Sequence, residues 1–402
     1  MVRRSDQVPV GRLVGGPVTV AGFRPYTEMV PAAALSAAWH STMTALAPLV
    51  EGEAAASEGG RRLTPALVQA LIAHRLYRLW IPRTFGGEEL TLPESLAIFE
   101  ATSRMDGSFG WATTIGAGGG LFAAQLEPQF AREVFGPTEA LIAGSGTPSG
   151  TAMREAGGFS VTGRWRYASG SQCATWFTAS CALQDAGGPI LDVAGRRTFR
   201  AMAFPRDRIT VHDTWDALGM RATTSHDFSA EDVFVPAGHS FDVLGTPLES
   251  GPLYHFPFNN IAELSFAAVA LGAALHGVEE FRRLAAGKRL HYGTDLVQNV
   301  PITRHRIANA EVMMGASREG FYAAAANGWS AVSAGAVLDD TGQADITNAC
   351  ILATEAATRS LDLLLPLAGM SPLLPGSTFG RCWRDTHTVA QHALLSPLRR
   401  RE

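Results

Sequence analysis

The sequence of 402 residues has few cysteines, and their spacing forms no known pattern. Cys173, Cys181, Cys350 and Cys382 are scattered without a Cys-x-x-Cys pair. Such thiols give neither a zinc signature nor a disulfide framework. We therefore expect no metal site, and we expect the protein to work in a reducing cytoplasm.

Charge and long apolar runs are scarce as well. Charged residues make up 17% of the chain and the formal net charge is −4, which argues against nucleic acid or an anionic membrane surface as the partner. No uninterrupted apolar run of about 18 residues occurs, so we expect no membrane span. Hydrophobic residues nevertheless reach 46%. Because such a surplus often covers subunit interfaces, we expect a homodimer or a homotetramer.

The residue pattern changes twice along the chain and predicts an α+β fold. Residues 1–30 are punctuated by Pro and Gly and are expected to form an N-terminal arm. Helical periodicity over 31–139 predicts a helical domain, in which residues 51–62 are expected to form a solvated turn. Short strands over 140–240 predict a small central β-barrel or sandwich. Helical periodicity returns over 241–402 and predicts a four-helix bundle.

The segment GRWRYASGSQCATW, residues 163–176, carries the most information about a ligand. It alternates like a strand and then breaks at Ser169-Gly170, where a hydroxyl followed by a residue without a side chain suits close approach of a flat ligand. Alternation predicts that Tyr167 and Ser169 share one face of this strand. An ordinary buried strand that ends in a turn is the alternative. Together with the histidines near the C-terminus, the segment points to a flavin site.

Two longer segments resemble the acyl-CoA dehydrogenase superfamily. LWIPRTFGGEEL, residues 79–90, is similar to the family's Pro-x-x-x-Gly-Gly loop. DTWDALGMRATTSHDFSAEDVFVP, residues 213–236, is similar to the end of its β domain. The resemblance covers nearly the whole chain and implies a helical domain, a small β domain and a four-helix bundle in that order.

The motifs expected of a dehydrogenase in this superfamily are missing. Removal of an α-proton from an acyl thioester needs a carboxylate base beside the flavin. The family's Glu-Pro-x-x-Gly-Ser-Asp loop is replaced by AGSGTPSG at residues 143–150, and its Tyr-Glu-Gly near the C-terminus is absent. Glu355 is a candidate base, although a solvated helix face explains its segment equally well. An FAD-dependent acyl-CoA or acyl-carrier dehydrogenase is therefore the weaker alternative.

Four segments instead resemble the two-component flavin-dependent monooxygenases, the group D hydroxylases. They are GRWRYASG, AGSGTPSG, DGSFGWATT and RCWRDTHTVAQH. The resemblance implies that a separate reductase supplies reduced FMN or FAD. It further implies that O₂ reacts with this flavin to form a C4a-hydroperoxyflavin, which hydroxylates an aromatic or polyketide-like small molecule.

The same resemblance assigns roles to individual residues. It implies that Ser169 forms a hydrogen bond with flavin N5 and that His392 stands near flavin C4a as a catalytic residue. The further cofactor contacts expected from the motifs are Tyr167, Trp111, Ser145 and Gly170. A neutral imidazole can accept a phenol proton at physiological pH, so His392 is expected to act as the base.

Helical geometry allows only one of His387 and His392 to face the pocket, and the position in the recognised motif selects His392. If both lie on one helix they are roughly 140° apart and cannot face the same pocket. His212, His226 and His239 match no motif and are expected to be structural. An N- or S-oxygenase on the same scaffold and a non-catalytic flavin-binding subunit remain open as further alternatives.

Overall fold

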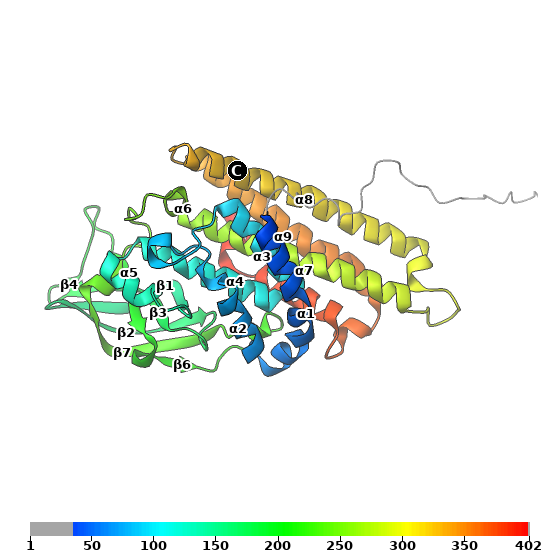
Figure 1. Cartoon of the computed structure of the whole chain (residues 1–402), viewed down its shortest axis with the longest axis horizontal. Coiled ribbons are helices and arrows are strands. Elements are labelled where there is room, and N and C mark those ends of the chain that lie inside the picture. The colour runs from blue at the N-terminus through cyan, green and yellow to red at the C-terminus, as the bar shows by residue number, and fades with distance from the viewer. Residues whose placement is uncertain (1–34, 401–402) are drawn as a thin grey trace, which may run out of the picture. The chain divides into compact units, whose positions relative to one another are not determined.

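The computed structural model describes residues 35–400, so the predicted arm over residues 1–30 lies outside the described residues. Helices form the first and the last parts of the described chain, and the strands between them in the sequence lie together (Figure 1). The N-terminal part consists of α1 (Ala37–Gly60), α2 (Pro65–Ala73), η2 (Leu76–Arg78), η3 (Arg83–Phe85), α3 (Leu92–Met105), α4 (Gly107–Gly120), η4 (Leu121–Ala124) and α5 (Pro128–Phe135).

Side-chain caps start the four helices α1 to α4. Thr91 at the start of α3 and Asp106 at the start of α4 accept hydrogen bonds from backbone N–H groups of the first turn. The solvated turn predicted over residues 51–62 is wrong, because α1 continues to Gly60 and ends at Arg61 in a left-handed conformation. Alanine and glutamate, which make up half of that segment, favour helix strongly enough to extend it.

The central strands form one eight-stranded sheet, which confirms the expected α+β class with its central β domain. Its order is β6-β7-β2-β1-β3-β5-β8, with β4 paired to β3. Every pairing is antiparallel except that of β1 with β3. The strands are β1 (Ile142–Glu155), β2 (Gly158–Ala168), β3 (Trp176–Asp185), β4 (Gly188–Pro189), β5 (Phe199–Pro205), β6 (Thr210–His212), β7 (His226–Pro236) and β8 (Ser240–Phe241).

The C-terminal part is a helical bundle, and α7, α8 and α9 run side by side (Figure 1). Its elements are α6 (Pro252–His255), α7 (Phe258–Gly287), η8 (Val297–Asn299), α8 (Pro301–Ser333), α9 (Asp340–Ala368), η9 (Ser371–Leu373), α10 (Thr378–Val389), η10 (Ala393–Leu395) and η11 (Pro397–Arg399). Among the described residues, α7 is the one helix long and apolar enough to cross a membrane, but 94% of that stretch is buried. It is therefore the central helix of the bundle.

The helical and sheet regions share apolar cores. Ile81 and Phe135 of the helical part pack in one cluster with Ile142 and Trp176 of the sheet. Helix α4 also lies close to α3, because a Cβ at Gly110 would come within 2.0 Å of Ser103 Oγ. The described chain changes from helices to strands and back to helices near the predicted domain boundaries. The division into domains at 31–139, 140–240 and 241–402 itself stays a prediction.

Candidate active site

Strand β2 ends one residue before Ser169, and the chain then turns sharply. The Ser169 N–H donates to the Tyr167 carbonyl at 3.0 Å, and the Gly170 N–H donates to the Thr223 carbonyl at 2.8 Å. Gly170 has φ of 78°, the left-handed region that glycine adopts without strain. The turn therefore rests on the loop of residues 213–225 between β6 and β7, here called the β6–β7 loop.

Three hydroxyl groups form a chain at this turn. Trp111 Nε1 donates to Ser169 Oγ at 2.9 Å, and Ser169 Oγ lies 2.7 Å from Ser225 Oγ. Ser225 Oγ lies 2.7 Å from Thr223 Oγ1, which donates to the Met220 carbonyl at 2.9 Å. All of these side chains are buried. We call Ser169, Ser225 and Thr223 the hydroxyl relay.

An aromatic cluster adjoins the relay through Trp111. The rings of Trp111 and Phe266 have centroids 4.8 Å apart, and the His392 ring lies 4.4 Å from Phe266 and 6.0 Å from Trp111. The structure thus brings together Trp111 from α4, Ser169 after β2 and His392 after α10. These three predicted residues are far apart in the sequence and meet at one place.

His392 is not on the predicted helix, because α10 ends at Val389. The comparison of helix faces between His387 and His392 is therefore wrong, and the residue that joins the cluster is the one that the motif position selected. His387 lies on α10, where its Nε2 is 3.0 Å from a carboxylate oxygen of Asp362.

The surroundings of His392 fix its protonation state. Its Nδ1 accepts the Leu394 N–H at 3.2 Å, so the proton of the neutral ring is on Nε2. Burial lowers the pKa of His392 to about 4. The ring is thus a neutral hydrogen-bond donor at Nε2, and this arrangement weakens the predicted role as a base.

Tyr167 and Ser145 stand apart from this cluster. Tyr167 has φ of 67° and is 57% exposed, whereas Ser169 is 7% exposed, so the prediction that they share one strand face is wrong. The Tyr167 ring instead makes an edge contact with Trp215, at a centroid distance of 6.1 Å. Ser145 lies on β1 opposite Ala179 of β3, just before a register shift. Their contacts with flavin stay predictions.

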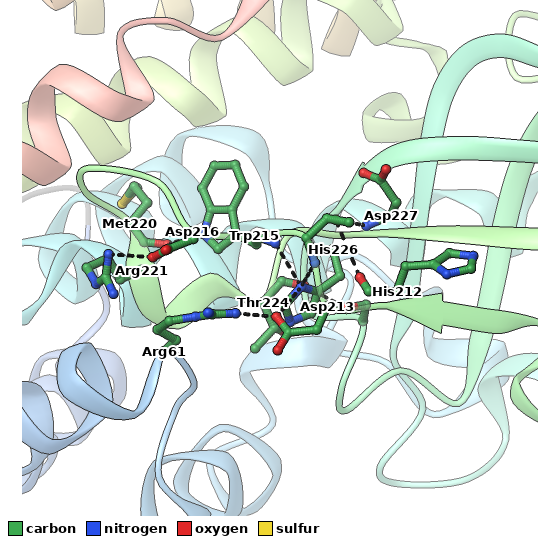
Figure 2. A network of polar contacts seen from close by, with 12 residues as sticks. Arg61, His212, Asp213, Trp215, Asp216, Met220, Arg221, Thr224, His226 and Asp227 are labelled. Carbon is green, nitrogen blue, oxygen red and sulfur yellow. Dashed lines mark hydrogen bonds and ion pairs between the residues drawn. The ribbon is translucent and has the colours of Figure 1, made fainter.

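A polar network holds the β6–β7 loop in place (Figure 2). His226 Nδ1 accepts the N–H groups of Thr214 at 3.1 Å and Trp215 at 3.0 Å, and Arg61 pairs with Asp213 at the same corner. Burial lowers the pKa of His226 and keeps Nδ1 free to accept these bonds. His226 therefore has the structural role predicted for it.

The backbone of this loop adopts rare conformations. Met220 and Thr224, with φ of 53° and 47°, flank the short helix η6 (Arg221–Thr223). A β-branched residue such as threonine seldom adopts a left-handed conformation, and such residues concentrate at active sites. The surrounding network must stabilise these conformations, and they place the hydroxyls of Thr223 and Ser225 in the relay.

Helix α10 fixes the other side of the β6–β7 loop. The Met220 N–H donates to Asp385 Oδ1 at 2.5 Å, and Gly219 packs so closely that a Cβ there would lie 2.2 Å from the Arg384 carbonyl oxygen. Burial, and next the nearby Asp106, raise the pKa of Asp385 to about 8. Asp385 therefore couples the helix that precedes His392 to the loop that carries the relay.

The segment after His392 is fastened to α7. Arg399 donates to Glu263 Oε1 at 2.7 Å, while Asn260 and Thr347 donate to Oε2 of the same buried carboxylate. This anchor holds the segment of η10 and η11 against the bundle and keeps His392 beside Phe266.

Comparison with known proteins identifies the family. Residues 264–397 match the model of the acyl-CoA dehydrogenase C-terminal domain. The indole-3-acetate monooxygenase of Pseudomonas putida is 30% identical over 340 residues, which span 83% of this chain and 84% of that enzyme. This chain belongs to the flavin-dependent monooxygenases. The flavin-dependent monooxygenase oxygenase subunit HsaA of Rhodococcus jostii is 26% identical over 368 residues, 89% of this chain and 94% of that subunit.

Solved structures of flavin-dependent monooxygenases share the fold. XiaF from a Streptomyces species, solved in complex with FADH2 and glycerol, matches with a TM-score of 0.82 and 25% identity, over 90% of this chain and 92% of XiaF. The 3-HSA hydroxylase from Rhodococcus sp. RHA1 matches with the same TM-score and identity, over 90% and 94% of the two chains. The expected resemblance to this group is thereby confirmed.

The residues of this flavin-dependent monooxygenase that sequence reasoning missed are Phe266, Ser225 and Thr223. The hydroxyls of Thr223 and Ser225 lie inside the recognised segment of residues 213–236, but nothing in their spacing marks them. Glu355, the candidate base of a dehydrogenase, lies on α9, where it is 3.6 Å from Arg359. Among the described residues it makes no hydrogen bond or ion pair with Trp111 or His392.

The groups around Ser169 fit a flavin. Ser169 Oγ is buried and uses two of its three hydrogen-bonding positions within the protein, which leaves one position for a ligand. Gly170 adds no side chain beside it, and Trp111 and Phe266 supply flat apolar surfaces. A planar ring system with one polar edge atom matches this combination.

Proposed function

We propose that the protein is the oxygenase component of a two-component system and hydroxylates an aromatic or polyketide-like small molecule. A separate flavin reductase provides reduced FMN or FAD, and O₂ is the cosubstrate. The observation that carries the proposal is the meeting of Ser169, Trp111 and His392 in one cluster, in which Ser169 and Trp111 are buried. The names of relatives that act on indole-3-acetate and resorcinol support an aromatic substrate.

Each residue of the cluster has its own role in this proposal. Reduced flavin, when bound, supplies the electrons that activate O₂. Ser169 accepts a hydrogen bond from the cofactor at N5, and Gly170 leaves room for its edge. Trp111 and Phe266 keep water away from the reacting atoms, which protects the activated oxygen from loss before transfer.

His392 positions the substrate in this proposal. With its proton on Nε2, the neutral ring donates a hydrogen bond to a substrate oxygen. Such a donor stabilises a phenolate oxygen and orients the ring carbon that receives the oxygen atom. Because the pKa of His392 is lowered to about 4, the substrate must lose its proton to another group or bind as the phenolate.

We also propose that the protein is cytoplasmic and forms a homodimer or homotetramer. Large apolar side chains are exposed on the outer faces of the bundle, including Ile302 and Val312 on α8 and Leu352 on α9. Contact with a second copy would remove this apolar surface from water.

Reoxidation of bound flavin tests the proposal. Protein loaded with reduced flavin is mixed with O₂ and the return of oxidised-flavin absorbance is followed by stopped flow. We expect a delayed phase absent from free flavin, and we expect Ser169→Ala to shorten that delay about tenfold, the effect of roughly one lost hydrogen bond. Ser171→Ala is the matched control. It removes a hydroxyl from the same turn, but one whose proton is donated to the Thr224 carbonyl at 2.6 Å and not to the flavin. Reoxidation at the free-flavin rate in the wild type, with bleaching by an acyl-CoA, would establish a dehydrogenase instead.

A further inference from the structure

The hydroxyl relay ends on a group that can only accept. Met220 offers a carbonyl oxygen, which has no proton, so Thr223 Oγ1 must donate its single proton to it across 2.9 Å. The carbonyl itself is held in place, because Trp215 Nε1 also donates to it at 2.9 Å and the Met220 N–H donates to Asp385.

Counting protons along the relay fixes the direction of every bond. Thr223 has used its proton, so Ser225 donates to Thr223 across 2.7 Å. Ser225 has then used its own proton, so Ser169 donates to Ser225 across 2.7 Å. On its other side Ser169 accepts the indole N–H of Trp111 at 2.9 Å. Ser169 therefore has no proton left for a ligand and one lone pair that can accept.

We propose that Thr223 and Ser225 are positioning residues that make Ser169 an obligatory acceptor, so that the site selects reduced over oxidised flavin. Reduced flavin carries a hydrogen on N5 and can donate it, whereas oxidised flavin has only a lone pair there and would face another lone pair. This inference rests on the proposed function, because it concerns the same contact between Ser169 and N5. It extends that function to the redox state of the flavin that is bound. The residues that set this choice are Ser225, which contacts Ser169, and Thr223, which contacts Ser225.

Burial of the relay makes the direction of its hydrogen bonds costly to change. Ser169, Ser225 and Thr223 are 7%, 5% and 3% exposed, so water does not replace a lost partner at low cost. Reversing the direction of the hydrogen bonds in the relay would release the Thr223 hydroxyl from the Met220 carbonyl. Each hydroxyl proton of the relay would then point toward the ligand. Such selection suits an oxygenase component that receives reduced flavin and must release the oxidised product.

The test compares binding of the two redox states. Dissociation constants of oxidised flavin are measured in air and those of reduced flavin anaerobically, for wild type, Thr223→Val, Thr223→Ser and Ser225→Ala. Thr223→Val keeps the shape but removes the hydroxyl, which frees the Ser225 proton and lets Ser169 donate to the ligand. We expect oxidised flavin to bind more tightly, so that the preference for reduced flavin falls about five- to tenfold. Thr223→Ser should keep the wild-type preference, and Ser225→Ala should behave like Thr223→Val.

The potential of the bound flavin gives a second reading. A tenfold loss of preference corresponds to a potential lower by about 30 mV for a two-electron couple. A wild-type preference that is unchanged in both Thr223→Val and Ser225→Ala would overturn the relay while leaving the proposed function intact. Failure of the wild type to bind reduced flavin would overturn both.

Discussion

At the scale of single residues, the tautomer of His392 determines what this side chain can do. A base would need a free nitrogen lone pair directed at the substrate, but Nδ1 is already occupied by the Leu394 N–H at 3.2 Å. A donor role predicts that an amide side chain can partly replace the ring. We expect His392→Gln to retain several times more product per reduced flavin than His392→Ala, as measured by product analysis in single-turnover reactions.

The pH dependence of the same variants separates donor from base. Because the pKa of His392 is lowered to about 4, its ring stays neutral across the physiological range and product yield should show no step near pH 6.5, the ordinary value for histidine. A step near that pH that disappears in His392→Gln would show that the ring acts as a base.

Other residues show where prediction from sequence succeeds and fails. The membership of Ser169 and His392 in one candidate cluster could be predicted, because both lie in recognisable segments. Tyr167 was misplaced because its left-handed backbone breaks the alternation on which the prediction depended. The hydroxyls of Thr223 and Ser225 could not be found, because a relay depends on distances between loops that no periodicity reveals.

At the scale of elements, Asp385 joins α10 to the β6–β7 loop. With its pKa raised to about 8, the carboxyl is mostly protonated at neutral pH, and asparagine is then a close substitute that still accepts the Met220 N–H. We expect Asp385→Asn to be nearly neutral in stability. Asp385→Ala should lower the free energy of unfolding by about 1–3 kcal/mol, because it leaves a buried donor without a partner.

Urea unfolding at neutral pH measures both Asp385 variants. An Asp385→Asn protein as unstable as Asp385→Ala would show that the carboxylate acts through its charge, for example toward Arg381, which lies 3.2 Å from Asp106 in the same cluster. Flavin affinity provides a second comparison, since loss of this bond should also loosen the loop that carries Thr223 and Ser225.

The elements themselves were largely predictable. Most helix positions follow from periodicity and from caps such as Thr64-Pro65 at the start of α2. The ends of the helices were harder to predict where helix propensity and polar character point to different structures. Residues 51–62 are an example, because they are polar enough to suggest a solvated turn but most of them complete α1. The end of α10 at Val389 was missed as well, since no glycine or proline marks it.

At the scale of the whole molecule, buried histidines make stability depend on pH. Burial lowers the pKa of His276 and His392 to about 4 in the folded protein, against about 6.5 in an unfolded chain. Between these values the unfolded chain binds more protons, so the free energy of unfolding falls as the pH is lowered. Above about pH 6.5 both states are neutral at these groups and the stability is fully present.

Urea midpoints measured from about pH 7 down to about pH 4.5 check this expectation. Each histidine should contribute a slope of up to about 1.4 kcal/mol per pH unit. His276→Gln, on α7, should reduce the slope without altering flavin binding. A slope that is the same in His276→Gln and the wild type would contradict the assignment.

The order of helices, sheet and helices was predictable because each part has its own residue pattern, and the family resemblance then supplied the arrangement. What the sequence could not provide is the meeting of α4, the turn after β2 and the segment after α10 at one cluster. That meeting depends on packing between residues more than 200 positions apart, such as Trp111 and His392.

Oxygen transfer is the central claim, and isotopically labelled O₂ tests it most directly. The protein is mixed with flavin reduced in advance, without a reductase, and with aromatic candidate substrates, and the products are examined by mass spectrometry. We predict a hydroxylated product that carries one labelled oxygen atom, in an amount that falls in Ser169→Ala and stays near wild type in Ser171→Ala. Label found in water or peroxide alone across the substrates, or a desaturated acyl thioester formed with oxidised flavin, would contradict the account.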